Sequence, residues 1–380
     1  MNDPEEKRSA LVDLSGDDRP VNPSIKPLRK GQKVLGCGSK KCVKRLVQVS
    51  LCVAGVPLVL LLVVVPLLIY FFPHLMQHLF FLNFRRMPMT DYENVTANSV
   101  KSIGRSFYLD GEQGKIGTWH VLPASISNKF KESGIQPSDQ EIEDLIKKER
   151  FPVFLYAHGN SFDRTISHRC ELYNVLSDQD YHVIAFDYRG YGDSEGSPTE
   201  DGIVADTRTV YEYALKHIGS NTLIIWGHSM GTGVSTRLVQ QLSNEGKAPD
   251  GLVLEAAFNN LHDVVVNHPF SIPLRWMSSK MFDSLIVNPL RSAGLIMESD
   301  KRITEITCPI LIMHADDDHV IPARLGRLLA ESAERAGRDV EYVEFDAKRE
   351  FKHKFIYLAP ELPQIVRDFV RKCERVKHSM

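Results

Sequence analysis

The chain carries the stretch TLIIWGHSMGTGVSTRLV at residues 222–239, and this stretch decides the fold. Residues 222–225 form an apolar, β-branched run typical of a buried strand, and residues 232–239 begin a helical pattern. Between them lies GHSMG at 227–231, a G-x-S-x-G motif. A strand, a sharp turn and a helix are the context in which this motif presents a serine hydroxyl at a strand tip. We therefore predict that Ser229 is a nucleophile.

A nucleophilic serine needs a base, and the base needs a carboxylate that orients it. In hydrolases that carry this motif, the acid follows the serine in the sequence and the base comes last. A second buried-strand pattern, PILIMH at 309–314, runs into ADDDHVIP at 315–322. The spacing of the acid before Val-Ile-Pro selects Asp318, with Asp317 as the alternative. A merely solvated acidic turn would leave all three aspartates without a catalytic role.

The base is expected after the next strand. Residues 340–345 alternate between apolar and polar side chains as a strand does, and a charged loop then leads to His353. Residues 355–371 have the pattern of a closing helix. We predict that His353 is the base and that His319 and His378 are surface histidines.

An oxyanion hole needs two backbone N–H groups directed at the developing negative charge. The first is expected from Met230, the residue after the nucleophile. The strand at 153–157 ends in His158-Gly159-Asn160, which suggests the Asn160 amide as the second donor. Because this donor belongs to the backbone, the position of Asn160 matters more than its identity. His158 is interpreted as structural, although with Asp163 it also matches the H-x4-D spacing of some acyltransferases.

The body of the chain, about 99–375, alternates strand and helix patterns. Strands are predicted at 182–186, 223–226, 252–254, 310–314 and 341–345, with helices between them such as 201–217 and 324–336. This alternation predicts a mostly parallel sheet covered by helices on both faces, and with the GHSMG motif it indicates the α/β-hydrolase fold. Residues 130–150 are charged and helix-prone and are interpreted as an insertion. Residues 376–380 are expected to be a tail.

The alternation of strand and helix patterns stops between residues 255 and 303, where aromatic and methionine side chains accumulate. We interpret about 259–303 as a lid over the serine, and ordinary helix packing on the sheet is the alternative. An apolar lid suits an acyl chain better than a peptide. The candidates to meet an anionic headgroup at its rim are Arg189, His268 and Arg275.

Residues 46–72 contain no charged side chain, which is long enough to cross a bilayer as a helix. We predict a single transmembrane signal-anchor helix at 46–73, preceded by a disordered basic arm at 1–45 and followed by an interfacial connector at 74–98. A re-entrant hairpin bent at Pro57 and Pro66, or a buried core helix, are the alternatives.

Basic residues set the orientation of such a helix. Eight Lys or Arg residues lie between 26 and 45, whereas Arg85 and Arg86 follow the segment closely. This bias predicts a cytoplasmic N-terminus and a catalytic domain on the other side of the membrane. The one N-glycosylation sequon, at Asn94, falls on that side.

The composition restricts the class of function. The formal net charge of −2 over 380 residues gives no reason to expect a nucleic-acid partner. The six cysteines show no C-x-x-C pair that would suggest a metal site, so no metal or other cofactor is predicted. Cys37 and Cys42 lie beside the membrane segment and are candidates for palmitoylation.

Three segments resemble a known family: FDYRGYGDS at 186–194, WGHSMGTG at 226–233 and HKFIY at 353–357. They are similar to the membrane-bound lysophosphatidylserine lipases, α/β-hydrolase-domain proteins of the endoplasmic reticulum that are also described as monoacylglycerol lipases. The resemblance covers roughly residues 40–372. It implies that Ser229, Asp318 and His353 form the triad, that lysophospholipids and monoacylglycerols are substrates, and that the protein resides in the endoplasmic reticulum membrane. The bulky, acidic residues 161–163 after Asn160 depart from the small residues expected there.

Other function classes fit the same motifs. A thioesterase, a peptidase or a general esterase would use the same fold, because the fold does not fix the leaving group. A membrane scaffold without catalysis would not need the three triad residue types in this order. The sequence alone therefore predicts a serine hydrolase of lipid esters as the leading interpretation.

Overall fold

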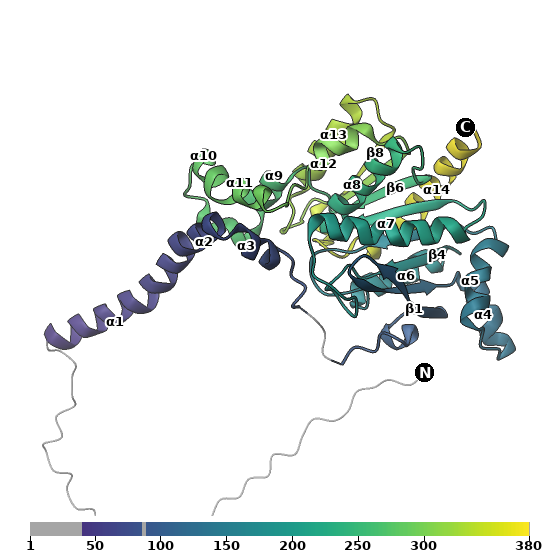
Figure 1. The fold of residues 1–380 in the computed structure, drawn as a ribbon, viewed down its shortest axis with the longest axis horizontal. Helices are drawn as coiled ribbons and strands as arrows, with labels where there is room; N and C mark the ends of the chain where they lie inside the picture. The colour runs from purple at the N-terminus through teal and green to yellow at the C-terminus, as the bar shows by residue number, and fades with distance from the viewer. Residues whose placement is uncertain (1–39, 86–88, 380) are drawn as a thin grey trace, which may run out of the picture. The chain divides into compact units, whose positions relative to one another are not determined.

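The computed structural model describes residues 40–85 and 89–379, and its centre is an eight-stranded sheet (Figure 1). The strands lie in the order β1-β2-β4-β3-β5-β6-β7-β8. β2 pairs antiparallel with β1 and β4, and all other neighbours are parallel. The strands are β1 Gly104–Gly111, β2 Gly114–Val121, β3 Val153–Ala157, β4 His182–Phe186, β5 Leu223–His228, β6 Gly251–Glu255, β7 Ile310–Ala315 and β8 Val340–Phe345. The predicted α/β-hydrolase fold with a mostly parallel sheet is confirmed.

Helices cover both faces of the sheet and create a separate core on each face. One core combines side chains of α7, α8 and α13 with the strands, and the other combines those of α6 and α14. Alternate strand residues point to opposite faces, so a sheet buried on both sides needs continuous apolar strands. The longer helices around the sheet are α4 Ala124–Ser133, α5 Asp139–Lys148, α6 Ser167–Ser177, α7 Glu200–His217, α8 Met230–Asn244, α13 Ala323–Arg335 and α14 Leu362–Ser379.

The C-terminal end differs from the prediction. The pattern at 355–371 predicted one closing helix, but the chain forms a 3-10 turn, η7 Ile356–Leu358, before α14 begins. Pro360 precedes α14, and proline disfavours helical backbone in the residue before it. α14 then continues to Ser379, where Lys377 Nζ donates to the carbonyl oxygen of Asn221 at 2.7 Å. Most of the expected tail at 376–380 is therefore helical.

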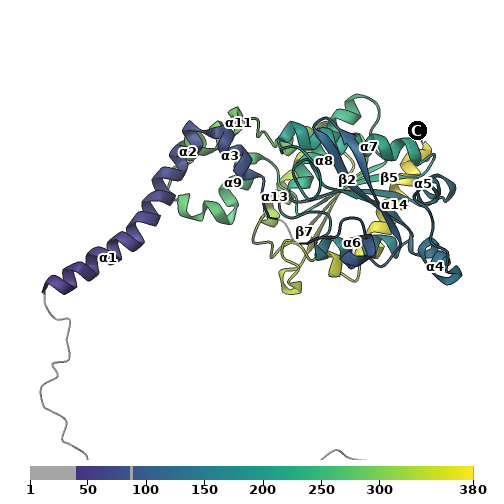
Figure 2. The same ribbon diagram turned by 60° about the horizontal axis from the view of Figure 1, so that its bottom comes forward.

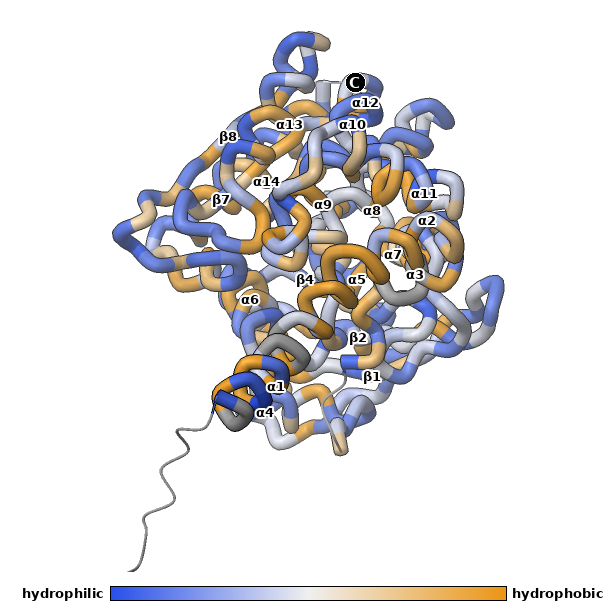
Figure 3. The backbone as a smooth tube through the Cα atoms, turned by 90° about the vertical axis from the view of Figure 1, so that its left-hand side faces the viewer, coloured by the Kyte–Doolittle hydropathy of each residue, from blue (hydrophilic) through white to orange (hydrophobic). Residues whose placement is uncertain are grey.

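The N-terminal apolar segment contains one helical stretch, Val43–Phe71, that is long and apolar enough to cross a membrane. It comprises α1 Lys40–Val59, a π-helical turn η1 Leu60–Val64 and α2 Val65–Phe71, and α3 Pro73–Phe80 follows. The widened turn lies just before Pro66, where the proline lacks an N–H and crowds the preceding turn. Figure 3 shows the hydropathy of each residue along the backbone. The basic arm predicted at 1–45 lies outside the described residues up to position 39, and residues 40–45 are helical.

The excursion between β6 and β7, where the strand and helix alternation stops, is built from short helices. They are α9 Leu261–Asn267, η3 Pro269–Leu274, α10 Ser279–Phe282, η4 Asp283–Val287, α11 Asn288–Ser292, α12 Ser299–Arg302 and η5 Ile303–Glu305. The part of the apolar segment after Pro57 packs against them: α2 contacts η4 and α11, α3 contacts α11, and η1 contacts η3. Figures 1 and 2 both show α2 and α3 beside α11. We call residues 259–303 the helical excursion.

Candidate active site

Ser229 occupies the sharp turn between β5 and α8 that the GHSMG motif predicted. Its backbone has φ 55° and ψ −121°, outside the regions that a residue with a side chain adopts at low cost. Its N–H donates to the carbonyl oxygen of Glu255 at 2.9 Å, which joins the turn to the end of β6. The strained turn holds the hydroxyl at the strand tip, and the serine is 9% exposed.

The flanking glycines are required by close backbone approach. A Cβ at Gly231 would overlap the carbonyl oxygen of Ala157, the last residue of β3, and a Cβ at Gly227 would overlap the carbonyl of Gly231. Neither obstacle is a flexible side chain that could move away. The motif therefore packs the start of α8 directly against the end of β3, which brings Ser229 close to the loop that follows β3.

The structure brings Ser229, His353 and Asp318 together in one hydrogen-bonded chain. His353 Nε2 lies 3.0 Å from Ser229 Oγ, and His353 Nδ1 lies 2.7 Å from Asp318 Oδ2. These distances are within hydrogen-bonding range for proton transfer between a serine and an imidazole. The three residues follow β5, β7 and β8, whose carboxyl ends lie at one edge of the sheet.

Asp318 is held as a buried carboxylate. Its Oδ1 accepts hydrogen bonds from the backbone N–H groups of Val320 at 2.8 Å and Ile321 at 2.9 Å, while Oδ2 faces His353 and also lies 3.3 Å from His314 Nε2. Burial raises the pKa of Asp318, but the electrostatic interaction with His353 and the hydrogen bonds from His314 and His353 lower it further than burial raises it. The net pKa is well below the usual value, so the group is ionised at neutral pH.

The neighbouring aspartates have other partners. Asp317 Oδ1 accepts from the backbone N–H of Lys352 at 2.9 Å, and Asp316 Oδ1 lies 3.1 Å from Arg327 Nη2. Asp317 thus fixes the loop before His353 rather than the imidazole itself. The alternative assignment of the acid to Asp317 does not match this geometry.

The backbone N–H groups of Met230 and Asn160 form no hydrogen bond with other described protein groups. Met230 begins α8 directly after Ser229, and Asn160 lies in the loop after β3 that packs against the serine. A Cβ at Gly159 would stand 3.1 Å from Ser229 Cβ, which measures how close this loop comes. Two unpaired N–H groups beside a serine hydroxyl can bind an oxyanion.

Three residues beside the site were missed by sequence reasoning. His228 Nε2 lies 2.9 Å from the carbonyl oxygen of His353, and burial lowers the pKa of His228 to about 3, so a neutral imidazole donates to that carbonyl. His314 reaches Asp318 as described, and Arg169 bonds to carbonyls of the loop after β3. His228 lies inside the motif and His314 ends a predicted strand, but nothing in the sequence distinguished their side chains from ordinary core residues.

Two interpretations of single side chains can be tested against their positions. His158 is fully buried with Nε2 3.4 Å from Asp187 Oδ1, and Asp163 instead accepts from Tyr92 Oη at 2.9 Å. This supports a structural His158 and gives the H-x4-D spacing no catalytic geometry. The prediction that Arg189 is a candidate headgroup ligand is wrong, because its side chain is buried at 3% exposure and its Nη2 lies 2.6 Å from Asp206 Oδ1.

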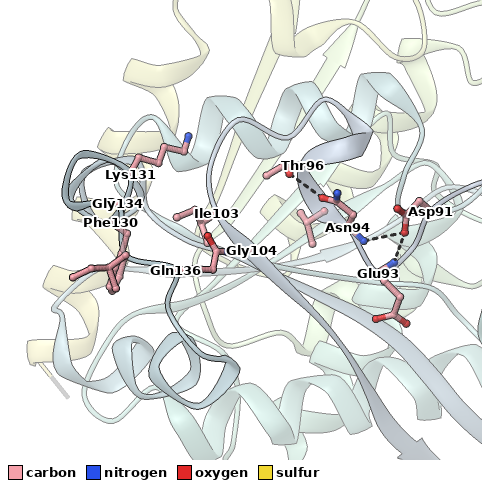
Figure 4. A pocket seen from close by; sticks show the side chains of 12 residues that line it. Asp91, Glu93, Asn94, Thr96, Ile103, Gly104, Phe130, Lys131, Gly134 and Gln136 are labelled. Carbon is pink, nitrogen blue, oxygen red and sulfur yellow. Dashed lines mark hydrogen bonds between the residues drawn. The ribbon is translucent and has the colours of Figure 1, made fainter.

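A hollow of about 750 Å³ lies away from Ser229, between the segment 91–96, the start of β1 and the end of α4 (Figure 4). Asn94 lies at this hollow with an exposed side chain, and its Oδ1 accepts from Thr96 Oγ1 at 2.8 Å and from the Ala97 N–H at 3.2 Å. The sequon is therefore on the surface.

Comparison with known proteins places the chain in a family. The model of the alpha/beta hydrolase fold family matches residues 152–279. Two solved structures share the fold: an alpha-beta hydrolase from Vibrio vulnificus, with a TM-score of 0.52, 20% identity and coverage of 70% of this chain and 80% of that one, and the Pyrococcus furiosus esterase Pf2001, with a TM-score of 0.55, 15% identity and coverage of 76% and 97%.

Curated relatives are much closer in sequence. The lysophosphatidylserine lipase ABHD12 of Danio rerio is 39% identical over 314 residues, 81% of this chain and 80% of that protein. The rat protein of the same name is 38% identical over 87% of this chain and 81% of its own length. The human protein ABHD12B is 35% identical over 70% and 72% of the two chains. The chain therefore belongs to the ABHD12 family and is a carboxylic ester hydrolase of the α/β-hydrolase fold.

Proposed function

We propose that the protein is a membrane-bound lysophospholipase that cleaves lysophosphatidylserine, and also monoacylglycerols, by a Ser229–His353–Asp318 mechanism. The observation that carries the chemistry is the hydrogen-bonded chain from Ser229 Oγ through His353 to Asp318. The name of these relatives, lysophosphatidylserine lipase, supports the substrate class.

The proposed steps use only these residues and water. His353 Nε2 accepts the Ser229 proton as Oγ attacks the ester carbonyl, and Asp318 keeps the imidazole in the tautomer that can accept it. The N–H groups of Met230 and Asn160 bind the oxyanion. When the tetrahedral intermediate collapses, the glycerol oxygen leaves and takes the proton from His353. Water, deprotonated by the same histidine, then attacks the acyl-serine ester, and His353 returns that proton to Ser229 Oγ as the fatty acid is released.

The helical excursion supports a lipid substrate. Three of its side chains expose large apolar surface: Phe270 at 70%, Ile272 at 56% and Trp276 at 59%. η3, which carries the first two, contacts η1, the π-helical turn within the apolar segment. Exposed aromatic side chains at such a position suit a membrane interface. A single acyl chain could pass from the bilayer to Ser229 without complete exposure to water.

Positive side chains beside the catalytic histidine support an anionic headgroup. Lys354 follows His353 directly and is half-buried, and burial together with the positive charges of Arg169 and Arg85 lowers its pKa. Arg85 lies over the ring of Phe162, 5.9 Å from its centroid. Among the described residues, neither Lys354 nor Arg85 pairs with a carboxylate, so both can meet a phosphate or carboxylate of a substrate.

We also propose that the catalytic domain lies in the lumen of the endoplasmic reticulum, with the N-terminus in the cytoplasm. The excess of basic residues before the apolar segment and the exposed sequon at Asn94 support this orientation. In sealed microsomes, protease should spare residues 90–380, and glycosidase should shift the band of the wild type but not of Asn94→Gln. Digestion of the domain in sealed vesicles would reverse the orientation.

A substrate panel tests the function. Full-length protein would be assayed with lysophosphatidylserine, monoacylglycerol, a diacyl phospholipid, an acyl-CoA thioester and a short soluble ester. We expect the two single-chain lipids to be turned over fastest, and lysophosphatidylserine at least as fast as monoacylglycerol. Faster turnover of the thioester would favour a thioesterase, and faster turnover of the soluble ester would favour a general esterase.

A further inference from the structure

The segment that follows the apolar helices runs beside the loop that carries the proposed oxyanion donor. The Asn160 side chain joins the two: its Nδ2 donates to the carbonyl oxygen of Phe80 at 2.7 Å, and its Oδ1 accepts from the N–H of Leu82 at 3.1 Å. Leu82 and Ser161 also pair as a parallel β-bridge. These contacts are made by residues 80–82 of the interfacial connector predicted at 74–98, and from here on 'the connector' means residues 80–82. Residues 158–163 are called the oxyanion loop.

A third partner completes the bonding of the carboxamide. Tyr191, which is 1% exposed, donates from Oη to Asn160 Oδ1 at 2.8 Å. The oxygen thus accepts two hydrogen bonds and the nitrogen donates one, and a carboxamide oxygen has two lone pairs. Because the carboxamide is separated from the backbone of Asn160 by a single CH₂ group, fixing it also restricts the direction of the Asn160 N–H.

A different side chain, Arg169, holds the rest of the oxyanion loop. Arg169, which is 2% exposed, donates from Nη1 to the carbonyl of Asp163 at 2.6 Å and from Nη2 to the carbonyl of Ser161 at 2.8 Å. None of these bonds involves Asn160 itself. The carboxamide is therefore the polar side-chain link between the connector and the residue that presents the N–H.

The connector is itself fixed to the catalytic domain. Phe81 has no exposed surface and belongs to the core of the face covered by α7 and α8. Phe80 is the last residue of α3, which packs against α11 of the helical excursion. The oxyanion loop is thus hydrogen-bonded to the segment that follows the apolar N-terminal helices, about eighty residues earlier in the chain.

We propose that the Asn160 carboxamide is a positioning residue that fastens the oxyanion loop to the connector, so that the connector forms a structural part of the active site. The sequence predicts a role only for the backbone N–H of Asn160, whereas this arrangement also gives its side chain a role. The inference rests on the proposed function, because it requires the Asn160 N–H to bind the oxyanion.

Three variants of the full-length protein test the individual hydrogen bonds of the Asn160 carboxamide. Asn160→Ala removes all of them. Asn160→Asp keeps the two accepted bonds but replaces the donor to Phe80 with an oxygen that faces the carbonyl. Tyr191→Phe leaves both links to the connector intact. We expect kcat to fall by about tenfold to a hundredfold in the first two and by less than about fivefold in Tyr191→Phe, with KM within about threefold of wild type, since a misdirected donor affects the transition state more than the bound substrate.

Asn174 provides a matched control for a purely structural effect. On α6, its carboxamide also joins an incoming segment: Nδ2 donates to the carbonyl of Ser99 at 2.9 Å, and Oδ1 accepts from the N–H of Lys101 at 2.8 Å. It is 2% exposed and does not belong to the oxyanion loop. Asn174→Ala should lower the melting temperature at least as much as Asn160→Ala while kcat stays within about twofold of wild type.

A transition-state readout separates positioning from stability. The affinity for a trifluoromethyl ketone, which forms a tetrahedral oxyanion on the serine, should fall in Asn160→Ala by the same factor as kcat/KM. Wild-type kcat and ketone affinity in Asn160→Ala, or losses equal to those of Asn174→Ala, would overturn the proposal and leave the proposed function intact. Failure of the proposed function would appear separately, as hydrolysis that survives Ser229→Ala.

Discussion

The serine turn buries its apolar side chains, whereas the helical excursion buries most of its own but leaves three large ones on its surface. Around Ser229, every residue of β5 and the first seven residues of α8 are buried, and backbone groups approach so closely that only glycine fits at positions 227 and 231. In the excursion, short helices leave Phe270, Ile272 and Trp276 more than half exposed. A rigid, close-packed region suits the chemistry, and an exposed apolar surface suits contact with lipid. On the proposed function, bond cleavage and access to lipid are assigned to separate parts of the molecule.

The largest expected effect belongs to the serine turn. Ser229→Ala should reduce kcat/KM for every ester by about four orders of magnitude or more, because it removes the attacking oxygen. Circular dichroism and the melting temperature should match those of the wild type, since Ser229 Oγ bonds only to His353 among the described residues. A folded variant that kept a tenth of the wild-type activity would remove Ser229 as the nucleophile.

The close packing of the same region predicts a pH-dependent stability. Burial raises the pKa of Glu255, at the end of β6, to about 7, although the Trp226 indole N–H bond lowers it. Between the ordinary value of 4.5 and about 7 the unfolded chain releases this proton and the folded chain retains it, so stability falls as pH rises through that window.

Glu255→Gln abolishes that titration. The difference in unfolding free energy, variant minus wild type, should therefore increase by roughly 1–3 kcal/mol between pH 4.5 and pH 8. Thermal melts of both proteins at the two pH values would measure it. A difference that stayed constant with pH would show that Glu255 does not hold its proton in the folded state.

The sequence predicted the parallel part of the sheet well because strands buried on both faces are continuous apolar runs, and residues 153–157 and 182–186 match β3 and β4 in full. It missed β1 and β2, which form an antiparallel pair at the sheet edge. Their pattern is interrupted by polar side chains that are satisfied only by distant partners, such as Arg105 with Glu143 at 2.7 Å. The same limit applies to the site, where the motif order identified Ser229, Asp318 and His353. It did not identify Arg169 or the contacts of residues 80–82 with the oxyanion loop, because these join segments that are distant in the sequence.

The exposed apolar side chains of the helical excursion predict a loss of activity that depends on the substrate. Phe270→Ser combined with Trp276→Ser should lower turnover of lysophosphatidylserine in vesicles by about fivefold to tenfold. The reason is that each aromatic side chain that enters the bilayer is transferred favourably from water. Turnover of a short soluble ester should remain within about twofold. Leu358→Ser, which also removes an exposed apolar side chain but outside the excursion, is the control. An equal loss on both substrates would show that the excursion supports the site rather than lipid access.

The smallest expected effect concerns the headgroup. Lys354→Gln should lower kcat/KM for lysophosphatidylserine by about threefold to tenfold and leave that for monoacylglycerol nearly unchanged, since a partly screened charge pair contributes on the order of 1 kcal/mol. The ratio of the two values is the measurement, and Lys348→Gln, which lies in the loop after β8, is the control. An unchanged ratio would exclude Lys354 from headgroup selection.

The most direct test of the central claim is the position of a covalent adduct. Membranes that contain the full-length protein would be treated with an alkyl fluorophosphonate, and the adduct would be located by peptide mass spectrometry. We predict one adduct, on Ser229, that forms more slowly when lysophosphatidylserine is present and that is absent from His353→Ala over the same time, because the hydroxyl then has no base. An adduct on another residue, or labelling of Ser229 that lysophosphatidylserine does not slow at a concentration that saturates hydrolysis, would contradict the account.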